Sequence, residues 1–227
     1  MKKIKKRLQI FFNIIGYTIF KFIYGKIKLK IEIPDSEYKI LNKRIDKYSY
    51  NIFLCFRSRL YTDTINNTAI IRDNKIIENA SFQFKENFID KVENNVVLRI
   101  GTPRILKKKK GKIFSLLTGG GGNYNYWHWL YDVLPRIKLI ESLIDLRSVD
   151  YFLLPNLEKK FQKETLDILN IPETKRLSSK INRHISADEI ISTTHPYVFN
   201  NPSFDCLNIP NLILNFLKEK FLINEKN

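Results

Sequence analysis

Hydrophobic and polar residues follow different patterns in the two halves of the chain. Between residues 50 and 100, apolar residues come in short runs separated by polar and turn residues, which is typical of β-strands. Asp73-Asn74 lies between two of these runs and predicts a hairpin turn. The strands expected in this half are Ile52–Phe56, Thr68–Arg72, Lys75–Glu78, Ser81–Phe84 and Val96–Ile100.

After residue 110, strand-like runs alternate with longer segments of helical periodicity. This alternation predicts a parallel sheet with helices on its faces. The expected strands are Lys112–Thr118, Asp150–Leu154, Arg176–Ser179 and Glu189–Thr193, and the expected helices are Tyr126–Leu146, Glu158–Leu169 and a closing helix from about Pro210 to Ile223. We therefore expect an α/β protein with a basic amphipathic segment (1–30), a β-rich part (31–105) and a Rossmann-like half-domain (106–227).

The first 30 residues carry much of the positive charge. They contain nine Lys or Arg residues and no acidic residue, which leaves +7 of the net +16 for the rest of the chain. Leu8–Tyr24 is apolar but falls short of the roughly 20 residues that span a bilayer. On a helix its apolar side chains form one stripe flanked by lysines, which favours an interfacial helix on anionic lipid. A short tilted span is the alternative, and this distribution of charge argues against a nucleic-acid partner.

Two further features have plain interpretations. Cys55 lies among apolar residues and is expected in the core, and with the distant Cys206 it matches no disulfide framework or metal site. Lys107–Lys110 is expected to be a solvated hairpin tip, with attraction to anions or lipid as the lesser alternative. His184 follows Arg183 in a polar segment, and we assign it no role.

A glycine-rich segment, Gly119–Gly122, joins the strand expected at 112–118 to the helix that follows. Glycines allow close approach of the backbone to a ligand, and a helix start offers unpaired N–H groups and a positive dipole end. Such a loop suits an anion such as a diphosphate, although no Gly-Lys-Ser/Thr follows, so it is not a P-loop. The expected substrate-binding residues in this region are Gly119, Gly120, Gly121, Gly122, Asn123 and Asn125.

His128, Asp132 and Arg136 are spaced four residues apart and stack as one polar stripe on a helix. They would place a base, an acid and a guanidinium beside the glycine loop. The alternative interpretation is an exposed Asp132–Arg136 ion pair worth a few tenths of a kcal/mol. His195 follows the strand expected at 189–193, and carboxyl ends of parallel strands gather ligands. For His195, a turn residue fixed by Pro196 and a substrate contact both stay open.

The segment Asn123–Arg136 resembles the Asn-Tyr-x-His-Trp-Leu-x-Asp-x-Leu-Pro-Arg signature of glycosyltransferase family 61, found among bacterial capsular polysaccharide biosynthesis proteins. Four flanking segments resemble the same family in the same order: Arg59–Thr64, Asn66–Ile71, Tyr151–Pro155 and Thr194–Tyr197. The resemblance implies the first half of a two-domain GT-B enzyme from a bacterium. It also implies a nucleotide-sugar donor, a glycan acceptor and no cofactor. With either membrane interpretation of the amino terminus, the basic flanks place the protein at the cytoplasmic face of the inner membrane.

The chain departs from the family in its second half, because no His-Gly-Ala-Gly-Leu-like segment is present. We therefore expect an amino-terminal half, truncated or completed by a second chain. No Asp-x-Asp occurs either, so an inverting, metal-independent transfer is expected, with amides and cations stabilising the leaving diphosphate.

Within this interpretation, His128 is the expected base and Asp132 orients it or takes its role. Arg136 and His195 are expected at the substrate. Among the neighbouring aromatic residues Trp129 is expected as a sugar-stacking face, with Tyr124, Tyr126 and Trp127 as further candidates, although two or more of the four could belong to the core. The alternative function is a non-catalytic, acceptor-binding or membrane-anchoring subunit of a split glycosyltransferase.

Overall fold

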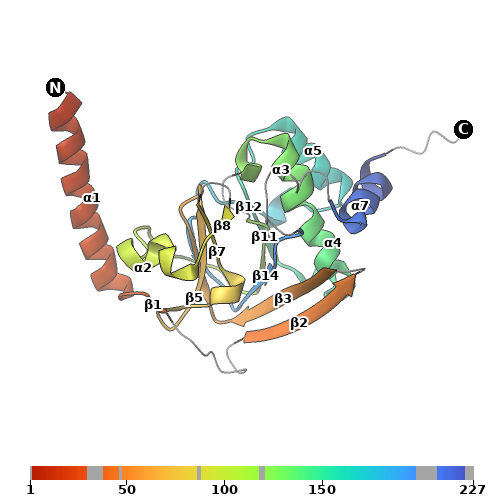
Figure 1. Cartoon of the computed structure of the whole chain (residues 1–227), viewed down its shortest axis with the longest axis horizontal. Helices are drawn as coiled ribbons and strands as arrows, with labels where there is room; N and C mark the ends of the chain where they lie inside the picture. The colour runs from red at the N-terminus through yellow and green to blue at the C-terminus, as the bar shows by residue number, and fades with distance from the viewer. Residues whose placement is uncertain are drawn as a thin grey trace, which may run out of the picture.

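The chain is a mixed α/β protein in which a layer of helices and two sheets are stacked (Figure 1). The structure is a computed structural model, and it describes residues 2–29, 38–45, 48–85, 88–117, 121–197 and 209–222. The α/β class expected from the sequence is confirmed.

The six-stranded sheet carries the parallel strands expected in the second half of the chain. Its strand order is β12 (Arg176–Ser178), β11 (Tyr151–Leu154), β10 (Lys112–Ser115), β14 (Glu189–Thr193), β3 (Tyr48–Phe56) and β2 (Tyr38–Ile45). The first four strands are parallel, whereas β3 is antiparallel to β14 and β2 is antiparallel to β3. Because β10 and β14 are parallel neighbours, the segments that follow them emerge side by side.

The second sheet is more irregular. Its main path is β1 (Lys28–Leu29), β6 (Lys75–Ile76), β5 (Asn67–Arg72), β4 (Arg59–Thr62), β13 (His184–Ser186) and β9 (Lys107–Lys108), with β7 (Phe82–Lys85) on β5 and β8 (Phe88–Ile89) on β7. The hairpin turn between β5 and β6 is confirmed, with positive φ at Asp73 (47°) and Asn74 (58°). Each sheet takes strands from both sides of residue 105, so the expected boundary there does not separate the sheets.

Alternating side chains of the six-stranded sheet face different layers. Ile52 packs in the core beneath the helices, and its neighbour Phe53 packs in the core between the two sheets. The helices over this sheet are α4 (Pro135–Glu141), α5 (Lys160–Ile168) and α7 (Asn211–Phe221), seen together in Figure 1. Cys55 is buried in the core between the sheets, as expected, and burial raises the pKa of its thiol to about 12. Cys206 lies outside the described residues.

Three expectations are corrected. Val96–Ile100 forms helix α2 rather than a strand, because the Asn95 side chain accepts a hydrogen bond from Val97 N and Gly101 ends the helix with a φ of 71°. Lys107–Lys110 is not a hairpin tip, because Lys107–Lys108 forms β9 and pairs with β13. His184 is not in a polar loop but in β13, and it is buried.

Helix α1 (Lys2–Tyr24) stands away from the body of the molecule (Figure 1). Its last turns hold it in place, since Lys21 Nζ donates to Arg99 O at 2.6 Å. Apolar side chains along it are exposed, and Phe22 keeps 91% of its surface. Among the described residues, no helix is long and apolar enough to cross a membrane.

Candidate active site at a π-helical turn

The helix expected at Tyr126–Leu146 is shorter than predicted and is interrupted. It begins as α3 (Tyr126–His128), passes through a π-helical turn at Trp129–Val133, and continues as α4. Leu134 N donates to Trp129 O at 3.1 Å, one residue further back than in an α-helix. Pro135 has no N–H to restore the normal ladder directly after this turn. Isolated π-helical turns are frequent at functional sites.

Asp132 lies at the centre of a hydrogen-bonded group formed by this turn and the segment after β14. Its Oδ2 is 2.7 Å from His128 Nδ1, and its Oδ1 accepts a hydrogen bond from Tyr197 Oη at 2.7 Å. Both carboxylate oxygens therefore have a fixed partner. We name His128, Asp132, Arg136, His195 and Tyr197 the Asp132 cluster.

The burial of His128 and Asp132 differs in a way that suits a base and its orienting acid. The His128 side chain is 35% exposed and that of Asp132 is 4% exposed. The hydrogen bond to Asp132 raises the pKa of His128, against an opposing effect of partial burial. Because the carboxylate accepts from Nδ1–H, neutral His128 carries its lone pair on Nε2. This arrangement gives a basic nitrogen that a ligand can reach.

His195 belongs to the same cluster but not to its surface. Its side chain is 4% exposed, its Nε2 is 3.9 Å from Asp132 Oδ2, and its Nδ1 is 3.0 Å from Tyr197 O. Burial lowers the pKa of His195 to about 4, so the ring is neutral near pH 7. His195 is thus placed to position Asp132 and Tyr197, rather than to touch a sugar as the sequence suggested.

Arg136 is fully buried, which contradicts the interpretation of an exposed ion pair with Asp132. Its Nη1 donates to Thr193 O at 3.1 Å and its Nε to Asp132 O at 3.2 Å. The guanidinium lies 4.7 Å from the centre of the Phe82 ring, and burial lowers the pKa of Arg136 to about 9. Arg136 therefore joins helix α4 to the end of β14 and places a positive charge beneath Asp132.

The described part of the glycine-rich segment serves packing. A Cβ on Gly122 would come within 2.6 Å of Val133 Cγ2, so the glycine permits close contact with the π-helical turn. Gly121 lies in a 3-10 turn with Gly122 and Asn123. Gly119 and Gly120 lie outside the described residues, and their expected contact with a diphosphate stays a prediction.

The two asparagines after the glycines have local structural roles. Asn123 Nδ2 donates to Thr64 O at 2.8 Å and its Oδ1 accepts from Asn156 N at 2.9 Å, so it ties two loops together. Asn125 caps helix α3 by accepting from His128 N at 3.4 Å. This cap occupies one of the N–H groups at the helix start, where an anion was expected to bind.

The aromatic residues near His128 divide between core and surface. Trp129 is fully buried and its Nε1 donates to Thr165 Oγ1 at 2.8 Å, so we withdraw it from the substrate-binding set. Tyr124, Tyr126 and Trp127 are exposed, and Trp127 stacks on Tyr131 with ring centres 4.0 Å apart. These exposed rings, not Trp129, are the available sugar-stacking faces.

Two members of the site were not among the residues expected from the sequence. Tyr197 and Thr193 flank His195, and they hold Asp132 and Arg136 respectively. Their position beside the carboxyl end of β14 was the signal that could have identified them. Nothing in the sequence alone indicated that Tyr197 would reach the carboxylate of a helix some 65 residues earlier in the chain.

Among the described residues, no group of three or more His, Cys, Asp or Glu side chains is arranged to hold a metal ion. Comparisons of the chain with protein-family models, curated proteins and solved structures find no significant match.

Proposed function

We propose that the chain is the amino-terminal half of an inverting glycosyltransferase that transfers a sugar from a nucleotide-sugar donor to a glycan acceptor in the synthesis of a capsular or other cell-surface polysaccharide. The observation that carries this proposal is the 2.7 Å contact between His128 and Asp132. These two residues lie in the segment that resembles the family 61 signature, and Asp132 is held in place from both sides. The resemblance implies a GT-B architecture, with the donor bound mainly by a second domain.

The chemistry requires one proton acceptor. In an inverting transfer, the acceptor hydroxyl oxygen forms a bond to the anomeric carbon while the bond from that carbon to the diphosphate oxygen breaks. The diphosphate leaves with the electron pair of the broken bond, and the hydroxyl proton goes to a base. His128 Nε2 takes this proton in our proposal, and Asp132 holds the ring and stabilises the imidazolium that forms.

The other cluster residues position this pair. Tyr197 and His195 hold the Asp132 carboxylate, and buried Arg136 offsets its negative charge without reaching the substrate. We assign acceptor contact to the exposed faces of Tyr124, Tyr126 and Trp127, because aromatic faces pack against the apolar faces of sugar rings. The leaving diphosphate is assigned to the segment around Gly119 and Gly120.

Helix α1 suits attachment to the cytoplasmic face of a membrane. Its exposed apolar side chains include Phe11, Phe12 and Phe22, and the sequence places lysines at both ends of the helix. Such a helix lies in the interface between headgroups and acyl chains. A membrane surface would bring the enzyme close to a growing cell-surface glycan.

The test is sugar transfer from a panel of labelled nucleotide sugars to isolated cell-surface glycans by the completed enzyme, in which a donor-binding second domain accompanies the unchanged chain or one of three variants. The chain without that domain should transfer no sugar. His128→Ala and Asp132→Asn should each lower kcat by about a hundredfold or more while leaving the circular dichroism spectrum unchanged. Asp145→Asn is the matched control, because this exposed carboxylate pairs only with Arg147 among the described residues, and it should leave kcat unchanged.

Normal turnover in both cluster variants would overturn the proposed base. Saturable glycan binding by the chain, with no sugar transfer from any donor even when the second domain is supplied, would favour the alternative function, an acceptor-binding subunit.

A further inference from the structure

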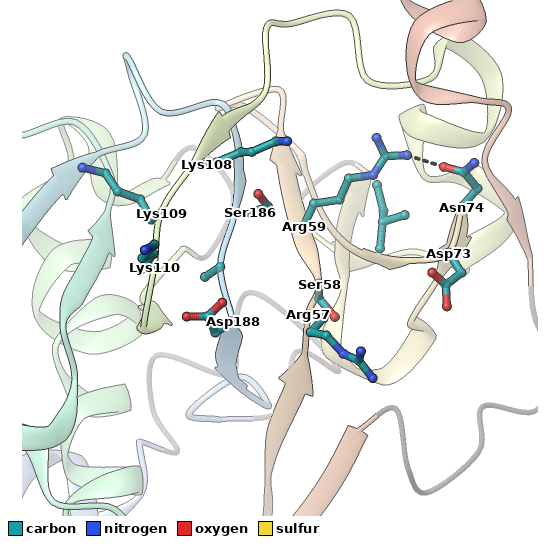
Figure 2. A pocket seen from close by; sticks show the side chains of 12 residues that line it. Arg57, Ser58, Arg59, Asp73, Asn74, Lys108, Lys109, Lys110, Ser186 and Asp188 are labelled. Carbon is teal, nitrogen blue, oxygen red and sulfur yellow. Dashed lines mark hydrogen bonds between the residues drawn. The ribbon is translucent and has the colours of Figure 1, made fainter.

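A pocket with a volume of about 720 Å³ opens on the eight-stranded sheet and shares no lining residue with the Asp132 cluster (Figure 2). Five of its lining residues are Lys or Arg, and two are Asp. We call it the β9 pocket, because strand β9 and the residues after it supply Lys108, Lys109 and Lys110. Its positive charge belongs to the body of the protein rather than to the basic amino terminus.

The two carboxylates of the β9 pocket are already engaged. Asp188 Oδ2 accepts a hydrogen bond from Gly111 N at 2.6 Å, and Asp73 Oδ2 accepts from Arg72 Nε at 3.0 Å. Neither carboxylate makes an ion pair with a cation of the pocket among the described residues. The pocket therefore keeps an excess of positive charge.

Lys108 and Arg59 lie in one row across the pocket, because both are in register with Ser186 of β13. In Figure 2, Lys108 extends from β9 toward Arg59 on β4, whereas Lys109 is directed the other way, with its Nζ 4.8 Å from the centre of the Tyr151 ring. Arg59 Nη2 donates to Asn74 Oδ1 at 2.5 Å and to Tyr24 O at 3.1 Å, and both of these acceptors are uncharged. Burial lowers the pKa of Arg59. A bound anion between Lys108 and Arg59 would supply the missing negative charge.

The β9 pocket lies at the base of helix α1. Arg59 bonds to the carbonyl of Tyr24, the last residue of that helix. On the other face of β9, Lys107 lines a separate pocket together with Phe20 of α1 and Arg104. Cations thus lie on both sides of the point where the exposed apolar helix meets the body. When α1 lies in the interface of an anionic bilayer, cations at its base are placed at the level of the lipid phosphates.

We propose that the β9 pocket binds the phosphate group of an anionic membrane lipid between Lys108 and Arg59, while α1 lies in the same membrane surface. This inference rests on the proposed membrane attachment of α1 and is independent of the transferase chemistry. It assigns the pocket a role in orienting the protein, because a lipid site and a helix at fixed positions together allow one orientation of the protein on the membrane.

The test is flotation of the intact chain with phosphatidylcholine vesicles that contain phosphatidylglycerol or lack it. The double variant K108Q/K110Q removes two exposed charges of the pocket, and we expect about a tenfold or greater loss of affinity for the anionic vesicles only. The matched control is K160Q/K163Q, which removes two exposed lysines from α5, far from α1 in Figure 1. The control should bind as the unchanged chain does.

A second variant separates the pocket from the helix. Phe11→Ser with Phe22→Ser removes exposed apolar side chains of α1 and should weaken binding to both kinds of vesicle. If these changes abolish binding and K108Q/K110Q matches K160Q/K163Q, α1 attaches to the membrane and the pocket proposal is wrong. If the phenylalanine changes have no effect on vesicle binding, the proposal that α1 attaches the protein to the membrane is wrong.

Two further titrations identify the source of the phosphate. Inorganic phosphate should bind far more weakly than the anionic vesicles, and an equal, Lys108-dependent affinity for free phosphate would contradict a lipid site. Oligonucleotide binding that is lost in K108Q/K110Q while vesicle binding is retained would assign the pocket to nucleic acid and overturn the proposal.

Discussion

Two regions of the molecule hold a histidine against a buried or backbone hydrogen-bond acceptor, and they differ in the charge of that acceptor. In the Asp132 cluster, His128 Nδ1 lies 2.7 Å from a carboxylate. At the base of α1, His184 Nδ1 lies 2.9 Å from the backbone carbonyl of Arg104, and its ring contacts Tyr24 and Tyr61. The pKa of His128 is raised by its partner, whereas burial lowers the pKa of His184 to about 4.

The difference shows that the partner, rather than the histidine, decides the chemistry available. A carboxylate favours the imidazolium and makes His128 a stronger base. A carbonyl fixes the ring of His184 without supplying a full negative charge, so desolvation dominates and the ring stays neutral. This contrast supports the proposal that the first region is catalytic, whereas in the second region His184 packs against Tyr24 at the end of α1.

The largest effect on stability is expected from Arg136→Ala. This change would remove the buried cation beneath Asp132 and leave Thr193 O without its donor, and it should lower the free energy of unfolding by about 3–5 kcal/mol. The matched control is Arg104→Ala, because the exposed side chain of Arg104 is lost while its carbonyl still holds His184, and it should cost less than about 1 kcal/mol. An equal loss of the free energy of unfolding in both variants, measured by urea denaturation, would contradict the difference between the two regions.

The next effect is a loss of stability in acid. His184 and His195 have pKa values of about 4 in the folded protein, below the ordinary value of 6.5. Between these values the unfolded chain binds more protons, so stability is complete above about pH 6.5 and falls as the pH drops toward about 4. Each histidine should account for about 2 kcal/mol between pH 7 and pH 5. The raised pKa of His128 acts in the opposite sense, since its contribution is lost as the pH rises.

The variant His184→Gln should reduce this pH dependence, because it removes one of the two groups that resist protonation. Urea denaturation at pH 7 and at pH 5 measures how much the free energy of unfolding changes with pH in each protein. The same change with pH in the variant and in the unchanged chain would show that His184 is protonated in the folded protein. It would contradict the lowered pKa of His184.

A smaller effect is expected from Tyr197→Phe. Loss of one hydrogen bond to Asp132 should cost about 1 kcal/mol of stability and lower turnover less than Asp132→Asn does. Tyr38→Phe is a suitable control, since that partly buried side chain lies on β2, outside the Asp132 cluster, and makes no hydrogen bond through its hydroxyl among the described residues. Turnover as low as in Asp132→Asn would give Tyr197 a direct part in the reaction.

Periodicity in the sequence was sufficient to predict the parallel strands, helix α5 and the hairpin at Asp73-Asn74, but it did not predict the interruption of the helix expected at Tyr126–Leu146. It also failed at Val96–Ile100, where a segment with three β-branched residues is helical because Asn95 and Gly101 cap it. Capping by single residues is a local effect that hydrophobic patterns do not register.

The site was predictable in part. The spacing of His128 and Asp132 predicted that their side chains lie together, since residues four apart share a helix face. Spacing could not predict that a π-helical turn would accompany the burial of Arg136 and Trp129, nor that Tyr197 would reach Asp132 from another element. Those features depend on tertiary packing between α4 and the end of β14.

The most direct test of the central claim is an NMR titration of the three histidine rings in the unchanged chain and in Asp132→Asn. We predict that His128 titrates above the ordinary histidine pKa of 6.5 and that Asp132→Asn lowers its pKa, while His184 keeps its value of about 4. A His128 pKa that is at or below the ordinary value, or that does not change in Asp132→Asn, would contradict the claim that Asp132 makes His128 the base.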